Sequence, residues 1–378
     1  MAHLLEMLTL CEGSFARAEQ MALEMIVKGG RTEVYLDLSL LLHAQGKIDG
    51  AKQTLELYAK TNPNSSALQY AQKYFQLMDG DLQAGSDHVE IGRSMGILAP
   101  ERGLYVKPRW VGQVDVKGKT VVLDCEGGLG DQIMQVRFAT HLSAMGAKVI
   151  VDCSPELGSL LSRSPCVTSV VCSEAGKRDS IKVHHDYHVM AMNAFGALKC
   201  TWDTLWPGQY VNAQDSDIWS RIIPKTPGVL NVGLRWAGNP LYENQQLRRF
   251  PVELMFNLTK IPGIKFWSLQ KGEPTILPPE VTDLEPFLST FEQTASAIKQ
   301  MDMVISSCTS IAHLAGAMNV PTCIVIPAMS YHPWARPGNK SSWYPSVILF
   351  RQKCYGDWKP PFDALYRDLQ AKQKGARS

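Results

Sequence analysis

Apolar and polar residues alternate with two different periods along this chain. Up to about residue 95 the apolar side chains recur every three or four positions, as in the run from Val34 through Leu38 to Leu42, and this spacing predicts amphipathic helices. After residue 117 short β-branched runs alternate with turns and helical stretches, which is typical of a parallel sheet with crossover helices. Residues 100–117, rich in Pro, Gly and charge, read as the linker between an all-α part and an α/β part.

The helical part contains a repeat. The run Gly13–Ala18 recurs as Gly46–Ala51 and as Gly80–Gly85, at spacings of 33 and 34 residues, and Pro63 closes one unit. The period resembles that of the tetratricopeptide repeat, so we expect about two and a half such repeats in residues 1–95. Two interpretations stay open: a helical bundle without a partner, or a surface for a protein partner or for self-association.

The α/β part shows two series of strands. The first is predicted at residues 120–124, 148–151, 167–172 and 187–190, and the second at 229–236, 264–269, 303–306 and 321–326, with a helix over 310–318. We therefore expect two Rossmann-like halves, residues 96–223 and 224–378. Ligands of such sheets bind beyond the carboxyl ends of the strands, and here that means between the halves.

Composition narrows the class of protein. With 378 residues, 45% of them hydrophobic, the chain can bury a large core, so disorder is excluded as its main state. The net charge of +2 offers no general attraction to nucleic acid or to an anionic membrane. No apolar run approaches the ~20 residues of a membrane span, and the first residues lack a signal-peptide pattern. Nine cysteines without a C-x-x-C pair indicate reduced thiols in a cytoplasmic protein and no structural zinc.

The first chemical motif is a glycine-rich turn after the first predicted strand. It reads Glu-Gly-Gly-Leu-Gly-Asp-Gln-Ile over residues 126–133 and includes Gly128, Gly130, Asp131 and Gln132. Glycines allow the backbone to approach a ligand, and amides at a helix start favour an anion. The run lacks the Gly-Lys-Ser/Thr of a phosphate-binding loop. The alternative is that Asp131 only caps the helix.

The second motif ends a strand and begins a small-residue helix. Ser307, Thr309 and Ser310 offer hydroxyls and amides to a phosphate, and His313 lies on the first helical turn. The alternative is N-capping by Thr309 with a packed histidine.

Polar loops follow two further strands. Arg235 and Arg248 belong to the first, where an arginine fork suits a diphosphate, while Gln270 and Lys271 belong to the second. The aromatic residues between 331 and 358 either stack a base or sugar or fill the core.

Together these segments resemble a family. Gly-Gly-Leu-Gly-Asp-Gln-Ile, Gly-Leu-Arg-Trp-Ala-Gly-Asn, Ser-Leu-Gln-Lys-Gly and Thr-Ser-Ile-Ala-His-Leu-Ala-Gly-Ala stand in the order seen in tetratricopeptide-repeat proteins with a heptosyltransferase-like (family 9-like) glycosyltransferase domain. The resemblance covers residues ~119–360 and implies a GT-B fold of two Rossmann-like domains. The acceptor would bind the first domain and the nucleotide sugar the second. Such enzymes are typically inverting and metal-independent, with the nucleotide-diphosphate sugar as co-substrate and no cofactor.

The resemblance also implies roles. Asp131 matches the proposed general base, with Gly128, Gly130 and Gln132 in the acceptor-side loop. The resemblance implies that the segment around Ser307, Thr309, Ser310 and His313 binds the donor diphosphate. It also implies that Arg248 neutralises the negative charge of the leaving phosphate. Arg235, Gln270 and Lys271 are further donor-side candidates.

Two positions depart from the family pattern. Cys308 and Gln245 stand where carboxylates are usual. This motivates an alternative, a repeat-based scaffold with a degenerate transferase domain. A phage-type DNA-base glycosyltransferase is the third possibility, so the acceptor is a glycan, a protein or a modified nucleobase.

Overall fold

The computed structural model describes residues 7–8, 10–11, 13–98, 105–173, 183–239 and 245–377. The chain divides into two compact units. The helical unit contains residues 1–98 together with 327–337 and 351–357, and the α/β unit contains 99–326, 338–350 and 358–378. No helix in the described ranges is both long and apolar enough to cross a membrane.

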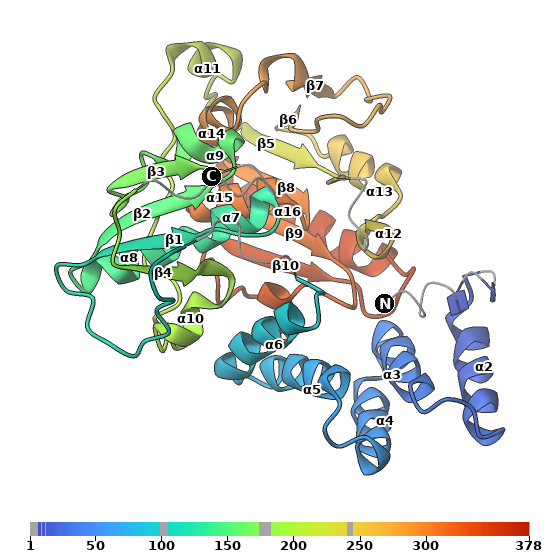
Figure 1. The fold of residues 1–378 in the computed structure, drawn as a ribbon. Coiled ribbons are helices and arrows are strands. Elements are labelled where there is room, and N and C mark those ends of the chain that lie inside the picture. Colours follow the sequence, from blue (N-terminus) through green and yellow to red (C-terminus); the bar gives the residue numbers. More distant parts are fainter. Residues whose placement is uncertain are drawn as a thin grey trace. The chain divides into compact units, whose positions relative to one another are not determined.

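The helical unit is built from antiparallel helix pairs (Figure 1). Its helices are α2 (Phe15–Val27), α3 (Val34–Ala44), α4 (Ile48–Thr61), α5 (Ser66–Met78) and α6 (Leu82–Ser94), with the 3-10 turn η4 (His332–Trp334). Gly13, Gly46 and Gly80 all have a positive φ, of 78°, 75° and 110°, at the turns that precede α2, α4 and α6. A left-handed residue is needed where one helix ends and the next turns back, which explains why glycine recurs with the repeat. The predicted helical repeat region is thus present.

Two segments distant in sequence complete this unit. The Tyr74 hydroxyl donates to the Ser330 carbonyl at 2.6 Å, and the Tyr355 amide donates to the Ala44 carbonyl at 2.9 Å. Met329 packs on the apolar core that α2 to α5 share. Helices α3 and α5 therefore bind residues 327–337 and 351–357, which belong to the same unit but come from the C-terminal part of the sequence.

The α/β unit contains two sheets with parallel strand pairs. The first has the order β3-β2-β1-β4, with β1 (Thr120–Asp124), β2 (Lys148–Cys153), β3 (Ser169–Cys172) and β4 (Tyr187–Met190). The second has the order β10-β9-β8-β5-β6-β7, with β5 (Leu230–Arg235), β6 (Ile264–Ser268), β7 (Val281–Asp283), β8 (Met303–Ser307), β9 (Thr322–Ile326) and β10 (Val347–Arg351). The predicted strands are confirmed within about two residues, whereas β7 and β10 were not predicted.

Helices connect and cover these strands. They are α7 (Leu129–Gln135), α8 (Arg137–Ala144), α9 (Pro155–Leu161), α10 (Ala194–Ala197), α11 (Asp217–Ile222), α12 (Gln245–Arg248), α13 (Val252–Phe256), α14 (Phe291–Lys299), α15 (Ser310–Ala317) and α16 (Lys359–Arg377), with 3-10 turns η1 (Ala191–Asn193), η2 (Asn257–Lys260) and η3 (Glu285–Phe287). The order of strand and helix explains the continuous apolar runs of the central strands, since parallel strands are covered on both faces.

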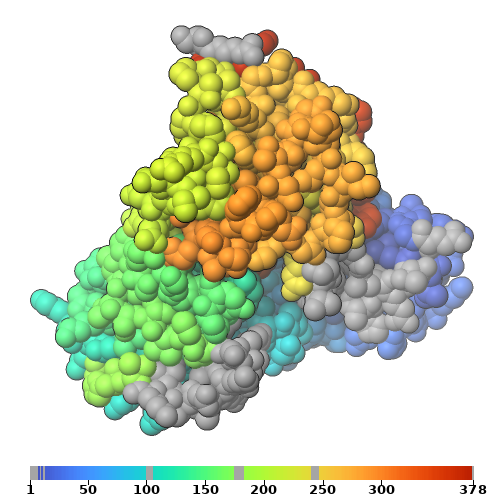
Figure 2. All heavy atoms as spheres, turned by 90° about the horizontal axis from the view of Figure 1, so that it is seen from above, coloured from blue at the N-terminus to red at the C-terminus, as the bar shows by residue number. Residues whose placement is uncertain are grey.

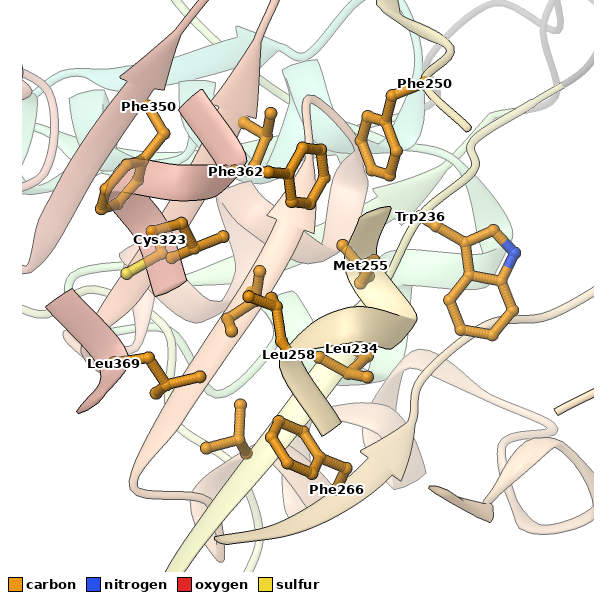
Figure 3. Close-up of a cluster of buried hydrophobic side chains, with 14 of the residues drawn as sticks. Leu234, Trp236, Phe250, Met255, Leu258, Phe266, Cys323, Phe350, Phe362 and Leu369 are labelled. Carbon is orange, nitrogen blue, oxygen red and sulfur yellow. The ribbon is translucent and has the colours of Figure 1, made fainter. Parts of the chain in front are cut away.

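The main core of the second sheet lies under α13 and α16 (Figure 3). Leu234 of β5 and Phe266 of β6 meet Met255 of α13 there, and Phe362 and Leu369 of α16 close the cluster. Each fully buried side chain of this size stabilises the fold by about 1.5–3 kcal/mol. This rigid base fixes the loops that leave the carboxyl ends of the strands.

Candidate functional site

The Asp131 carboxylate points back towards the glycine-rich turn between β1 and α7. Gly127 has a φ of 78°, and a Cβ atom at this position would lie 2.8 Å from Asp131 Oδ2. Oδ2 accepts a hydrogen bond of 2.8 Å from the Gly128 amide. Asp131 therefore caps α7, as the alternative interpretation expects, and the capping bond fixes the direction of the carboxylate at the helix start.

Gln132 holds the turn from inside. Its side chain is fully buried, donates to the Gly127 carbonyl at 3.1 Å and to Ser154 Oγ at 3.0 Å, and accepts from the Ser154 amide at 2.8 Å. A second glutamine, which was not predicted as a site residue, acts in the same way: the Gln135 side chain accepts from the Glu126 amide and donates to its carbonyl. These two glutamines make the turn rigid.

The start of α15 presents backbone amides that its N-cap side chain does not use. Thr309 makes no side-chain capping bond, and its hydroxyl lies 3.0 Å from Ser306 Oγ instead. Ser307 is buried, and its hydroxyl has no hydrogen-bond partner within the described ranges. Ser310 is the first helical residue and is half-buried. The expected alternative of simple capping by the Thr309 side chain is therefore not what the structure has.

The starts of α7 and α15 touch each other. A Cβ atom on Gly130 would lie 3.0 Å from the Ser310 Cα and 3.1 Å from His313 Cδ2. The two helices lie side by side in Figure 1, and Figure 2 shows residues of the two halves meeting along one face. The glycine-rich turn is thus in contact with the hydroxyl-rich helix start, although Gly130 and Ser310 are 180 positions apart in sequence.

His313 is a neutral, packed histidine. It is buried, and its Nδ1 lies 2.9 Å from the Tyr344 hydroxyl. Burial lowers the pKa of His313, the nearby Arg137 guanidinium acts in the same direction, and together they bring it to about 3. The imidazole therefore carries no charge to a phosphate at neutral pH.

Arg248 lies beside the start of α15. Its Nη1 donates to the Cys308 carbonyl at 2.6 Å. A Cβ atom on Gly238 would come within 2.5 Å of Arg248 Nη2 and within 3.2 Å of Thr309 Cγ2. Gly238, at the end of the β5 loop, thus makes room for the guanidinium against the helix start. Gln245 begins the same short helix, α12.

The other donor-side candidates organise the loops around this place. Arg235 Nη1 donates to the Leu269 carbonyl at 3.0 Å, and burial lowers the pKa of Arg235 to about 10. Gln270 is buried and accepts from the amides of Trp236 and Ala237. The exposed Lys271 donates to the Leu288 carbonyl at 2.8 Å. In the structure these side chains tie strand-end loops to one another.

One buried arginine was not predicted from the sequence. Arg137 of α8 is fully buried and lies 4.6 Å from the centre of the Tyr344 ring. An arginine inside a helix carries no sequence signal of burial. Among the described residues, no cluster of three His, Cys, Asp or Glu side chains is arranged to hold a metal ion.

The chain resembles glycosyltransferases in fold. It can be superposed on a family 9 glycosyltransferase from Veillonella parvula with a TM-score of 0.50 and 13% identity, covering 69% of this chain and 99% of that structure. For the Escherichia coli ADP-heptose lipopolysaccharide heptosyltransferase II the TM-score is 0.48 and the identity 14%, covering 69% of this chain and 100% of that chain. The α/β part thus has a GT-B-like glycosyltransferase fold.

In sequence, protein FlbA of Caulobacter vibrioides is 25% identical over 350 residues, which cover 83% of this chain. The match spans 57% of FlbA, so the chain corresponds to little more than half of that relative's length. No protein-family model matches the chain.

Proposed function

We propose that this protein is a glycosyltransferase that moves a sugar from a nucleotide-diphosphate donor to an acceptor hydroxyl. The observation that carries the proposal is the contact of Gly130 with Ser310, which places a carboxylate-bearing helix start against a hydroxyl-rich one. The glycosyltransferase-like fold supports it.

The donor diphosphate would bind at the start of α15. Backbone amides at a helix start attract phosphate oxygens, and here the N-cap side chain leaves them unused. The Ser307 and Ser310 hydroxyls and the Arg248 guanidinium surround the same helix start and would stabilise the charge on the leaving diphosphate. This arrangement would meet the charge without a metal ion or a cofactor, which we retain as part of the proposal.

Asp131 would act as the general base. An inverting transfer needs a carboxylate near the acceptor hydroxyl, on the face opposite to the departing diphosphate. Asp131 belongs to the opposing helix start, and its bond with the Gly128 amide fixes its direction. The acceptor would therefore bind on the α7 side, beside Gly128 and Gly130. We also propose a cytoplasmic location, on the expectation of reduced thiols that the sequence gives rise to.

Cys308 favours a second candidate function, a scaffold with an inactive transferase domain. It is buried just before the N-cap, where the resembled pattern has a carboxylate, and its carbonyl accepts a hydrogen bond from Arg248. In that case the helical unit would carry the function by binding a protein partner or a second copy of the chain.

Titration calorimetry with ADP-, GDP-, UDP-, CMP- and dTDP-sugars separates the two candidates. We expect one donor class to bind wild-type protein, and Arg248→Ala to weaken this binding at least tenfold. Arg249→Ala is the matched control, since Arg249 is exposed and pairs only with Glu273 among the described residues. Absence of binding by every donor would favour the scaffold.

A further inference from the structure

Arg137 is a buried cation whose hydrogen-bond partners are not carboxylates. Its Nε donates to the Met134 carbonyl at 2.9 Å, and its Nη atoms donate to the carbonyls of Leu205 and Trp343, at 3.3 and 2.7 Å, and to the Tyr210 hydroxyl at 3.1 Å. Removing a guanidinium from water is unfavourable unless hydrogen bonds and neighbouring groups compensate. A side chain held in this way fixes the positions of the groups that it bonds relative to one another.

Aromatic rings surround the guanidinium. Its central carbon lies 4.6 to 5.9 Å from the ring centres of Tyr344, Trp343, Tyr210 and Trp206. Cations bind to the faces of such rings, most strongly where water is excluded. The partners come from both sides of α15 in the sequence: residues 134–210 precede it, and residues 343 and 344 follow it. Arg137 therefore joins the two halves of the α/β unit.

Tyr344, one of the four aromatic residues around Arg137, also contacts the first turn of α15. The Tyr344 hydroxyl lies 2.9 Å from His313 Nδ1, and its ring fills the space where a Cβ atom on Gly316 would be, at 2.8 Å. The Tyr210 amide also donates to the carbonyl of Ala317, the last residue of α15. The helix is thus held at its first turn and at its end.

His313 is held on its other side by Gly130, 3.1 Å from the position of a Cβ atom there. We propose that Arg137 is a positioning residue, which acts through Tyr344 and His313 to set the start of α15 opposite the start of α7. This inference rests on the proposed function, because the group positioned is the proposed diphosphate site. Arg137 itself would touch no phosphate.

The contacts that run from Arg137 through Tyr344 to His313 are here called the relay. The test uses two variants that perturb the relay at different points. Tyr344→Phe keeps the ring against Arg137 and Gly316 and removes only the hydroxyl, which meets His313 and accepts a hydrogen bond from the Tyr210 hydroxyl. Arg137→Lys keeps the positive charge and loses the guanidinium fork. The matched controls are Tyr366→Phe, a partly buried tyrosine on the core of the second sheet, and Arg163→Lys, whose side chain pairs with Glu292.

Two measurements are made on the full chain: calorimetric binding of ADP, GDP, UDP, CDP and dTDP, and hydrogen exchange in peptides covering residues 309–317. We expect both relay variants to bind the preferred diphosphate about fivefold or more weakly, as the loss of a buried hydrogen bond predicts. We also expect faster exchange at the α15 start with little change in melting temperature for Tyr344→Phe. The controls should match the wild type in both measurements.

Two other results are informative. If wild-type protein binds none of the five diphosphates, the proposed function is wrong and this inference falls with it. If wild-type protein binds but Tyr344→Phe binds equally well and exchanges at the same rate, the positioning role is overturned and the proposed function stands. A lower melting temperature of Arg137→Lys with unchanged binding and exchange would show a merely structural role and would also overturn it.

Discussion

Gly130 and Ser310 approach each other so closely that one additional carbon atom would not fit between them. A Cβ atom on Gly130 would lie 3.0 Å from the Ser310 Cα, which is backbone and cannot rotate away. Helices α7 and α15 can therefore keep their present distance only with glycine at this position. The proposed base and the proposed diphosphate site are set by this contact.

Gly130→Ala tests the contact directly. We expect the substitution to push the two helix starts apart by a few tenths of an ångström and to lower turnover at least tenfold. Its effect on the free energy of unfolding should be small, because alanine in a helix gains up to about 1 kcal/mol over glycine and offsets the crowding. Gly375→Ala in α16 is the control, since nothing lies within 4 Å of its Cβ position. Unchanged turnover of Gly130→Ala would show that the spacing of the helices is not critical.

Gly238→Ala tests the placement of Arg248. A methyl group there would come within 2.5 Å of Arg248 Nη2, so the guanidinium must leave the Cys308 carbonyl. We expect the dissociation constant of the preferred nucleoside diphosphate to rise about tenfold, which corresponds to about 1.4 kcal/mol. In the Arg248→Ala background the same methyl group should have little further effect, because its clash partner is gone. If the loss of binding free energy in the double variant is instead the sum of the losses in the two single variants, this coupling is contradicted.

The helical unit should lose stability in mild acid because of His43. Burial is the main reason that the pKa of His43 is lowered to about 4, and Arg351 adds to it. Its ring is packed against Tyr74 and Phe75. The folded state keeps His43 neutral, whereas the unfolded chain protonates it near the usual pKa of about 6.5. Stability from this group is present above about pH 6.5 and is lost as the pH falls towards 4.

Urea unfolding between pH 7 and pH 4 measures this loss, which we expect to reach a few kcal/mol. His88, whose pKa burial also lowers to about 4, contributes a similar loss. His43→Gln should reduce the dependence on pH by about half, although it lowers stability at pH 7. The exposed His184→Gln is the control. A dependence on pH as steep in His43→Gln as in the wild type would contradict the assignment.

The parts of the fold that were predictable are those that local periodicity encodes. The turns at Gly46 and Gly80 follow from the repeat, and strands such as β2 follow from continuous β-branched runs. The position of the α7 and α15 starts on the side between the halves was also expected, because ligands of such sheets bind beyond the carboxyl ends of the strands.

Other features depend on contacts that no local pattern records. β7 has only three residues, too few for a periodic signal. The partners of Arg137 lie up to 207 positions away, at Tyr344, so its burial could not be foreseen. The Thr309 hydroxyl had two partners available, the helix amide and Ser306, and only the packed loop decides for Ser306.

Mass spectrometry of products measures sugar transfer by this protein and its dependence on Asp131 as the base. Wild-type protein and Asp131→Asn are incubated with a library of nucleotide sugars and a cell lysate as the source of acceptors. Asn can still accept the bond from the Gly128 amide, so the fold and diphosphate binding should persist. Asp81→Asn, at the start of α6 in the helical unit, controls for the loss of a capping carboxylate.

We predict a sugar-modified acceptor with wild-type protein and with Asp81→Asn, and product formation lowered by orders of magnitude with Asp131→Asn. Near wild-type product formation by Asp131→Asn would show that Asp131 is not the base. No product with any donor for the wild-type protein would show that sugar transfer is not its function.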